Sequence, residues 1–315
     1  MMGRPVLVAG GAGYIGSHVV RRLLSAHRDV VVLDNLSAGS KHENAAARFY
    51  AGDLLDSARV SSIVAEHGID TIVDAASIHH SAPRTSSFAA ALTDFVRSGV
   101  SKMIFTSSCA VYAPSQAGCL VDETYETNPP SRYGSEKLAF EQVLSSFSRS
   151  AGLRSVVLRC FNVAGAYHGS GFSGSPGDPS RLINLARDVA YGRSMYVPVL
   201  GSDFATMDGT CVRDYVHVDD VAGAYVDALS YLDEGGRTVV LNCGCGRGHS
   251  VREVIRAVEI ESGVMIPVRL FPRRPHDVPF MVACNDRIRE TLGWAPSNVS
   301  LSSIVRSALG SRGTT

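Results

Sequence analysis

The sequence lacks a hydrophobic run long enough to cross a membrane, and it lacks an excess of charge of either sign. Lys plus Arg and Asp plus Glu both number 30 among 315 residues, so the formal net charge is zero. A protein that binds nucleic acid or an anionic membrane through its overall charge carries a surplus of Lys and Arg. We therefore expect neither nucleic acid nor a membrane as a partner.

The sequence also lacks a Cys-x-x-Cys pair among its seven cysteines. Cys243 and Cys245 are two residues apart, which is a poor spacing for chelating a metal. We predict reduced thiols and no metal site. The first predicted strand begins at Val6, which leaves no room for a signal peptide. These absences together predict a cytoplasmic protein.

Glycine, by contrast, is abundant and is informative near the N-terminus. The run Gly10-Gly11-Ala12-Gly13-Tyr14-Ile15-Gly16 follows the apolar segment 6–9 and precedes a segment with apolar residues at helical spacing. Strand, glycine turn and helix in this order form a dinucleotide-binding unit, in which the backbone approaches a pyrophosphate at the helix N-terminus. The predicted cofactor residues in this run are Gly10, Gly13, Tyr14, Ile15 and Gly16.

An acidic residue ends the next predicted strand. Asp34 follows Val30–Leu33 and is placed to accept hydrogen bonds from the ribose hydroxyls of an adenosine. Its charge would repel a 2′-phosphate, so the sequence predicts NAD rather than NADP. Asp53 and Leu54 follow the third predicted strand and are placed to hold the adenine edge, although Asp53 could instead cap the predicted helix 57–67.

Predicted strands and helices alternate through the first half of the chain, which indicates an α/β fold with a doubly wound parallel (Rossmann) sheet. We expect an NAD-binding domain over 1–165, to which 210–242 returns. A smaller α+β domain that binds substrate is expected over 166–209 and 243–315. The predicted helix 221–231 is expected to be capped by Asp219 or Asp220.

Three residue types suggest the chemistry. Tyr133 and Lys137 are four residues apart on a predicted helix and so share one face. A nearby ammonium lowers the pKa of a phenol, which lets tyrosine exchange a proton with an alcohol near neutral pH. Ser108 ends a Thr-Ser-Ser cluster at the carboxyl edge of the fifth predicted strand, where such sheets bind ligands. The alternative for this cluster is a plain turn at a strand end.

On these residues the chain resembles the extended short-chain dehydrogenases/reductases, and within them the UDP-glucose 4-epimerase family most closely. The resemblance extends over nearly the whole chain. Its motifs are Gly10–Gly16, Asp34-Asn35-Leu36, Thr106–Ser108 with Val111-Tyr112, Tyr133–Lys137, Phe161-Asn162 with Gly165-Ala166, Asp208–Val218, Pro272-Arg273-Arg274 with Asp277, and Leu292-Gly293-Trp294.

The resemblance implies NAD-dependent epimerisation at C4 of a UDP-hexose, UDP-glucose or UDP-galactose, through a 4-keto intermediate. It implies that Tyr133 is the acid and base, that Ser108 bonds the sugar oxygen and that Lys137 holds the nicotinamide ribose. The resemblance also implies that Asn35 and Phe161 bind the cofactor, in addition to the residues named above. The residues implied to bind the nucleotide of the substrate are Asn162, Arg213, Arg274 and Asp277. For the two arginines the alternative is a surface ion pair with Asp214 or Asp277.

The chain also departs from the family pattern. The segment from Ser77 to Phe88 is short by about ten residues on ordinary loop and helix lengths. No Asn occurs between Asn44 and Asn128, His79 or His80 stands where the family commonly has Lys, and Arg181 stands at a position often filled by Asn. The short segment 77–88 predicts a weakened homodimer. Residues 165–179 are predicted to be a linker or a lid.

Other functions remain open at this point. A sugar-nucleotide 4,6-dehydratase needs an acid–base pair directly after the Ser/Thr cluster, where this chain has Cys109 and Ala110. A sugar-nucleotide reductase, or an epimerase acting on an N-acetylated or uronic sugar, fits the same motifs. The remaining alternative, from another class, is a catalytically impaired NAD-binding regulator.

Overall fold

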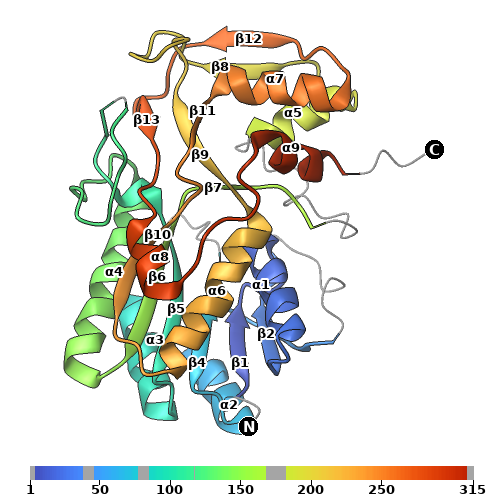
Figure 1. Ribbon diagram of the computed structural model, residues 1–315. Coiled ribbons are helices and arrows are strands. Elements are labelled where there is room, and N and C mark those ends of the chain that lie inside the picture. Colours follow the sequence, from blue (N-terminus) through green and yellow to red (C-terminus); the bar gives the residue numbers. More distant parts are fainter. Residues whose placement is uncertain (1–3, 38–45, 77–84, 117, 168–181, 311–315) are drawn as a thin grey trace.

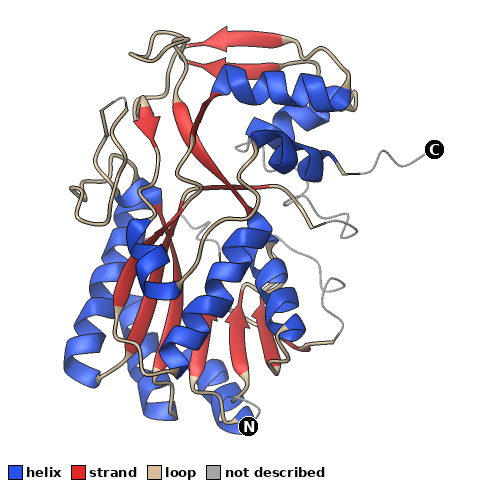
Figure 2. Ribbon diagram, viewed as in Figure 1, coloured by secondary structure: helices blue, strands red, loops and turns tan. Residues whose placement is uncertain are grey.

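Seven parallel strands form the central sheet of the computed structural model, which describes residues 4–37, 46–76, 85–116, 118–167 and 182–310 (Figures 1 and 2). In spatial order the strands are β10 (Val239–Cys243), β6 (Arg154–Cys160), β5 (Lys102–Ser108), β4 (Thr71–Asp74), β1 (Val6–Ala9), β2 (Val30–Asp34) and β3 (Arg48–Ala51). Every residue of β1, β2 and β4 is buried, as the continuous apolar runs of a sheet covered on both faces require.

Helices cover both faces of this sheet. Residues of α1 (Tyr14–Ser25) and α6 (Val218–Asp233) share one core cluster with one face. Residues of α2 (Ser57–His67), α3 (Thr85–Ser98) and α4 (Arg132–Ala151) share a second cluster with the other face. The predicted doubly wound parallel sheet is therefore confirmed.

A second group of elements lies above the carboxyl edge of this sheet in Figure 1. It includes a four-stranded sheet, a two-stranded parallel sheet and the helices around them. Its elements are β7 (Asn162–Ala164), α5 (Leu182–Ala190), β8 (Val197–Leu200), β9 (Val212–His217), β11 (Gly248–Ser250), α7 (Val251–Ser262), β12 (Val268–Phe271), β13 (Phe280–Met281) and α9 (Leu301–Leu309). Between β13 and α9, α8 (Asp286–Leu292) packs beside α6.

The chain crosses between the two groups more than once. In the segment 210–242, β9 pairs within the four-stranded sheet, whereas α6 covers the seven-stranded sheet and β10 extends it. The exact division into a domain of 1–165 with 210–242 and a domain of 166–209 with 243–315 stays a prediction.

Two helix caps differ from the sequence-based expectation. Asp56, rather than Asp53, caps α2 by accepting from the Arg59 N–H. His217 caps α6 through its Nδ1, which accepts from the N–H of Asp219 at 3.1 Å, so neither predicted aspartate is the cap. α2 begins at Ser57 as predicted, so its N-cap position falls on Asp56. α6 begins at Val218, three residues before the expected start at Val221, so its N-cap position falls on His217.

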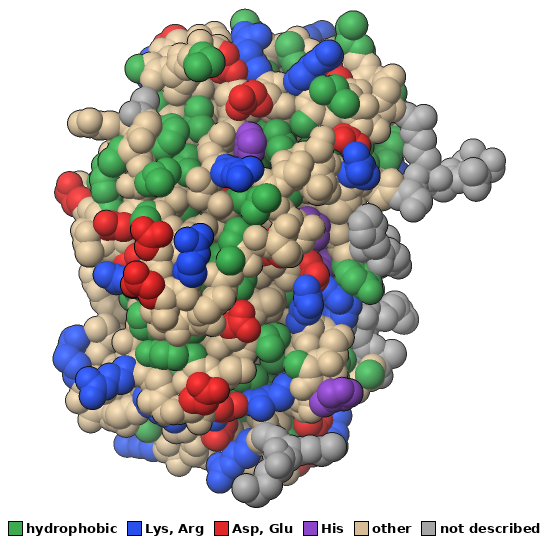
Figure 3. All heavy atoms as spheres, in the orientation of Figure 1, with side chains coloured by type: hydrophobic (Ala, Val, Ile, Leu, Met, Phe, Trp, Pro, Cys, Tyr) green, Lys and Arg blue, Asp and Glu red, His purple; other side chains and the backbone are tan. Residues whose placement is uncertain are grey.

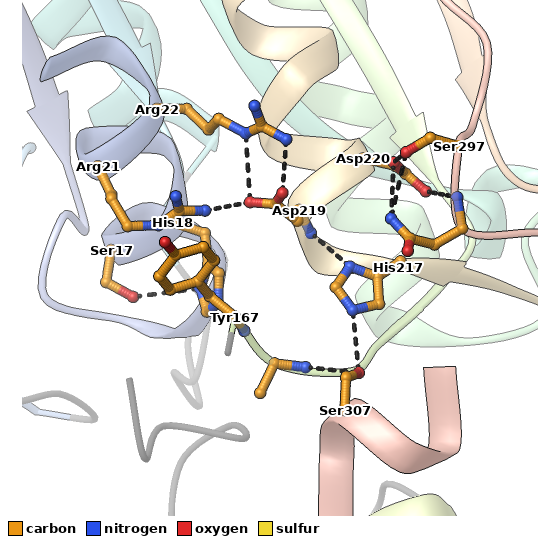
Figure 4. Close-up of polar contacts among 12 residues, drawn as sticks. Ser17, His18, Arg21, Arg22, Tyr167, His217, Asp219, Asp220, Ser297 and Ser307 are labelled. Carbon is orange, nitrogen blue, oxygen red and sulfur yellow. Dashed lines mark hydrogen bonds and ion pairs between the residues drawn. The ribbon is translucent and has the colours of Figure 1, made fainter. Parts of the chain in front are cut away.

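The carboxylate of Asp219 instead joins the two helices that cover one face of the sheet. It pairs with Arg21 and Arg22 of α1, as Figure 4 shows. His217 Nε2 lies 2.9 Å from Ser307 Oγ on α9. Because Nδ1 already accepts a backbone N–H, Nε2 carries the proton and donates it to the serine. These contacts connect α1, α6 and the C-terminal helix α9.

Charges of both signs are interspersed on the face drawn in Figure 3, in keeping with the neutral composition. Within the described ranges, no helix is long and apolar enough to cross a bilayer.

Candidate active site

A cavity of about 400 Å³ lies between the carboxyl edge of the large sheet and the second group of elements. Its lining includes Ser108, Tyr133, Phe161, Asn162, Arg213, Arg274 and Asp277 from the sequence-predicted set, with Tyr14 and Ile15 from the glycine turn. These residues are far apart in the sequence, and the crossing of the chain between the two sheets brings them together. A cavity of this size is typical of small-molecule sites.

The glycine turn has the geometry that a dinucleotide needs. Gly10 has φ +75°, a conformation that favours glycine. A Cβ on Gly16 would lie 2.0 Å from the Gly10 oxygen, so only glycine allows this approach of the helix to the turn. Gly13 stands at the N-cap of α1, which makes no side-chain cap hydrogen bond. The helix N-terminus is thus left to bind an anion such as a pyrophosphate.

Asp34 lies at the end of β2, beside this turn. Its two carboxylate oxygens accept from the N–H of Ala12 at 2.9 Å and of Leu36 at 2.7 Å. These bonds hold the turn against the end of β2 and fix the carboxylate. Each oxygen retains acceptor capacity for a ribose hydroxyl, since a carboxylate offers about four lone pairs. The structure at this turn therefore fits the predicted cofactor.

The remaining predicted adenine-side residues lie nearby in the fold. Asn35 follows Asp34 directly, and its side chain accepts from the Ser37 N–H at 3.0 Å. The Asp53 carboxylate accepts from the Leu55 N–H at 2.9 Å, and Leu54 is buried. Asp53 therefore shapes the turn after β3 rather than the N-terminus of α2.

Tyr133 and Lys137 lie on the first turns of α4, and Ser108 ends β5. Ser131 caps α4 by accepting from the Gly134 N–H at 3.1 Å. A Cβ on Gly134 would lie 2.0 Å from the Ala110 oxygen, so glycine is required for α4 to approach the turn after β5. This approach places Tyr133 and Ser108 on the wall of one cavity. The Tyr133 side chain is 44% exposed, so a ligand can reach it.

Lys137 is buried beneath this pair of residues. Its Nζ lies 5.9 Å from the centre of the Tyr133 ring and donates to the Thr106 carbonyl at 2.7 Å. Burial lowers the pKa of Lys137, and the carboxylate of Asp74 is the largest charge opposing that change. A cation held at this place favours the phenolate form of a neighbouring tyrosine.

The strand β5 continues through Ser108, so Thr106–Ser108 is not a plain turn. The Thr106 hydroxyl donates to the carbonyl of Asp74 at 2.5 Å and also contacts the hydroxyl of Tyr225. Both bonds hold the end of β5 in place beneath Ser108.

A buried ion pair that was not predicted from the sequence supports the same residues. Arg159 of β6 bonds both carboxylate oxygens of Glu141, with distances of 2.7 to 3.2 Å, and Ser107 donates to the same carboxylate. Both partners are 6% exposed. The pair and Ser107 join three elements that hold the site residues. β5 ends at Ser108, α4 carries Tyr133, and β6 ends two residues before Asn162. Glu141 lies one turn after Lys137, and that spacing is the sequence signal that could have revealed it.

The nucleotide side of the cavity has two arginines. Within the described part of the chain, neither Arg213 nor Arg274 forms an ion pair. The alternative of a pair between Arg213 and Asp214 is wrong, because Asp214 is fully buried and accepts from the N–H groups of Cys245, Gly246 and Ala283. Burial raises the pKa of Asp214 to about 6. The Asp277 N–H donates to the Arg274 carbonyl at 3.2 Å, so these two residues share a turn.

Cys109 and Trp294 supply neither an acid nor a base. Burial raises the pKa of the Cys109 thiol to about 12, which keeps it neutral. Trp294 is buried and donates to the Asp220 carbonyl at 2.9 Å, so it packs in the core. Among the described residues, no cluster of His, Cys, Asp and Glu could hold a metal ion.

Several predictions lie outside the described residues. They concern His79, His80, Arg181 and most of the segments 77–88 and 165–179.

Comparison with known proteins agrees with this geometry. Residues 6–244 match the model of the NAD dependent epimerase/dehydratase family. A UDP-glucose 4-epimerase of Azospirillum brasilense is 40% identical over 96% of this chain and 90% of its own. The crystal structure of UDP-glucose-4-epimerase from Stenotrophomonas maltophila with bound NAD and formylated UDP-arabinopyranose has a TM-score of 0.90 at 35% identity, over 98% of this chain and 97% of that one. The UDP-Glc/GlcNAc 4-epimerase from Campylobacter jejuni has a TM-score of 0.81 at 36% identity, over 98% of both chains.

Proposed function

This chain belongs to the NAD-dependent epimerase/dehydratase family, and we propose on that premise that it is an NAD-dependent UDP-glucose 4-epimerase. The reaction interconverts UDP-glucose and UDP-galactose through a 4-keto intermediate. The observation that carries this proposal is one cavity lined by Ser108, Tyr133 and Arg213, beside a turn shaped for a dinucleotide.

Tyr133 takes the proton of the sugar 4-hydroxyl and later returns a proton to the same oxygen. Lys137 supports the phenolate through its charge. Its ammonium donates to the Thr106 carbonyl and has two further N–H groups, which we propose bond the nicotinamide ribose. Ser108 Oγ, at the end of β5, hydrogen-bonds the reacting oxygen and holds it toward Tyr133. The ion pair of Glu141 and Arg159 fixes the elements that carry these groups.

NAD, when bound, supplies the hydride acceptor and donor for C4. The proposed residues for holding it are Gly10, Gly13, Tyr14, Ile15, Gly16, Asp34, Asn35, Asp53, Leu54, Tyr133, Lys137 and Phe161. The closeness of α1 to the glycine turn and the fixed carboxylate of Asp34 support this assignment.

The diphosphate is proposed to lie between Arg213 and Arg274, because a guanidinium can bond two phosphate oxygens at once. Both side chains line the cavity without an ion-pair partner in the described residues. Arg213 Nη1 donates to the Val212 carbonyl at 2.9 Å, and its other guanidinium N–H groups are proposed to bond the ligand. Asn162 and Asp277 are proposed to bond the remaining polar groups of the uridine diphosphate.

The test is an assay of the purified protein against UDP-glucose, UDP-galactose, their N-acetylated forms and a UDP-uronic acid, with separation of the products. We expect interconversion of the first two. A reductase would consume a stoichiometric reductant, and a regulator would bind NAD and leave every sugar unchanged. A 4,6-dehydratase would release a 4-keto-6-deoxy sugar, and the neutral thiol of Cys109 beside Ala110 opposes that outcome.

Cofactor choice gives a first prediction. Asp34→Ala should lower the ratio of NADPH to NADH dissociation constants about tenfold or more, because it removes a ribose acceptor and a charge that repels phosphate. Fluorescence titration with both dinucleotides measures the ratio. Asp34→Asn is the matched variant, since it loses the charge and keeps an acceptor for the Ala12 N–H. An unchanged ratio in both variants would show that Asp34 does not contact the ribose.

Self-association gives a second prediction. We propose a homodimer formed by the exposed flank of α3 and α4, weakened by the short segment 77–88. At about 25 cal/mol per Å² of apolar burial, the loss of a few hundred Å² removes several kcal/mol at most. Sedimentation at nanomolar to micromolar protein should therefore show dissociation of the dimer, with NAD exchanging readily. A dimer that persists at nanomolar concentration and keeps its NAD through gel filtration would contradict this prediction.

We further propose that the enzyme works in the cytoplasm. All seven cysteines are free, which suits a reducing compartment.

A further inference from the structure

Asn184 is a buried polar residue of α5 to which no sequence motif assigns a role. Its side chain lines the same cavity as Tyr133 and Arg213, and the residue is only 6% exposed. The amide Nδ2 is buried and has no hydrogen-bond partner in the described part of the chain. Among the buried side-chain atoms that share this property there, Asn184 Nδ2 is the one whose residue lines the cavity.

A buried amide N–H without a partner lowers the stability of the ligand-free protein. A buried donor without a partner loses its hydrogen bonds to water and gains nothing in return. Native proteins hold only a few such groups, and each calls for a reason. A ligand that supplies the missing partner is a sufficient reason, because Asn184 is part of the cavity wall.

The neighbours of Asn184 indicate what kind of ligand group this is. Its own helix contributes apolar side chains to the cavity, and the strand β8 and the start of α7 contribute more. These apolar lining residues are Leu182, Ile183, Leu185, Pro198, Leu200 and Val251. The charged lining residues Arg213 and Arg274 suit a diphosphate, whereas a neutral amide among apolar side chains suits a neutral, flat group with a polar edge.

We propose that Asn184 hydrogen-bonds the uracil base of the sugar nucleotide. The edge of uracil presents carbonyl acceptors and an N–H donor, and a carboxamide can match both kinds of group. The apolar side chains from α5, β8 and α7 then enclose the faces of the ring. This assignment rests on the proposed function, because it requires a uridine nucleotide in the cavity.

The test uses Asn184→Leu in the full-length enzyme and titration calorimetry with UDP. The dissociation constant of UDP should rise about tenfold, equivalent to about 1.4 kcal/mol. The melting temperature of the unliganded variant should be equal to or higher than that of the wild type, because a hydrocarbon replaces an amide that has no partner. A purely structural role would instead lower the melting temperature and leave the affinity of the folded protein unchanged.

Two further variants make the test specific. Asn184→Ala should weaken UDP binding by a similar factor, and it serves if the leucine is too bulky for the site. Asp188→Asn, which alters a half-buried residue of the same helix that does not line the cavity, should leave UDP affinity unchanged. Inorganic pyrophosphate, measured as a competitor, should bind the wild type and Asn184→Leu equally.

The outcomes separate this inference from the proposed function. If the wild type epimerises UDP-hexoses and Asn184→Leu binds UDP as the wild type does, the assignment of Asn184 is wrong and the proposed function stands. An equal loss of UDP and pyrophosphate affinity would place Asn184 at the diphosphate and overturn its contact with the base. If the wild type neither binds UDP nor epimerises a UDP-hexose, both proposals fail.

Discussion

Replacing Tyr133 by phenylalanine should lower kcat about 100-fold or more while the protein stays folded and binds NAD. The change removes only the hydroxyl, which carries the proton exchanged with the sugar in the proposed mechanism, and general acid–base catalysis contributes a factor of this size. The side chain is 44% exposed and lies on the cavity wall, so its loss leaves no cavity in the core. Steady-state kinetics with UDP-galactose measures the effect.

Tyr125→Phe is the control for this experiment. Its hydroxyl makes a long contact of 3.4 Å to the Pro114 carbonyl, and the residue does not line the cavity. Turnover of this variant should equal that of the wild type. A Tyr133→Phe enzyme that also retained wild-type turnover would contradict the role assigned to Tyr133.

Glu141→Gln should lower the free energy of unfolding by about 3 kcal/mol or more and reduce turnover as well. The Arg159 guanidinium would remain buried without its anionic partner, which is the costly case for a buried ion pair. The guanidinium also lies 4.8 Å from the ring of Tyr112, which cannot replace the lost charge. Urea denaturation measures the stability, and kinetics on the folded fraction measures turnover.

Two variants show whether the ion pair itself is responsible. Asp203→Asn removes a pair with Arg273 in which both side chains are exposed, and it should leave the urea midpoint nearly unchanged. The double variant Glu141→Leu with Arg159→Met should recover most of the stability, because apolar residues can replace a buried pair. It should not recover turnover if the pair also positions the catalytic elements. A stable and fully active Glu141→Gln enzyme would show that the pair has neither role.

The sequence predicted the parts of the site that local patterns encode. The glycine run, the acid at the end of β2 and the spacing of Tyr133 and Lys137 each follow from short-range geometry, and the structure places them at one edge of the sheet. The parallel sheet followed from continuous apolar runs that alternate with helical periodicity.

The sequence did not predict features that depend on contacts between distant residues. His217 caps α6 because β9 runs into the helix without a loop, which periodicity alone does not reveal. Arg213 and Asp214 are adjacent in the sequence, yet Asp214 turns inward to three backbone N–H groups and leaves the arginine to the cavity. No sequence pattern marks Asn184, because the absence of a hydrogen-bond partner for its Nδ2 depends on the packing of distant residues around it.

The central claim is that a hydride leaves C4 of the sugar and returns to C4 of the same molecule, while Tyr133 handles only the proton of the oxygen. The most direct measurement uses UDP-galactose with deuterium at C4, incubated with the purified enzyme in ordinary water. We predict that the UDP-glucose formed keeps its deuterium at C4. Loss of the label to the solvent, or the absence of UDP-glucose among the products, would contradict the account.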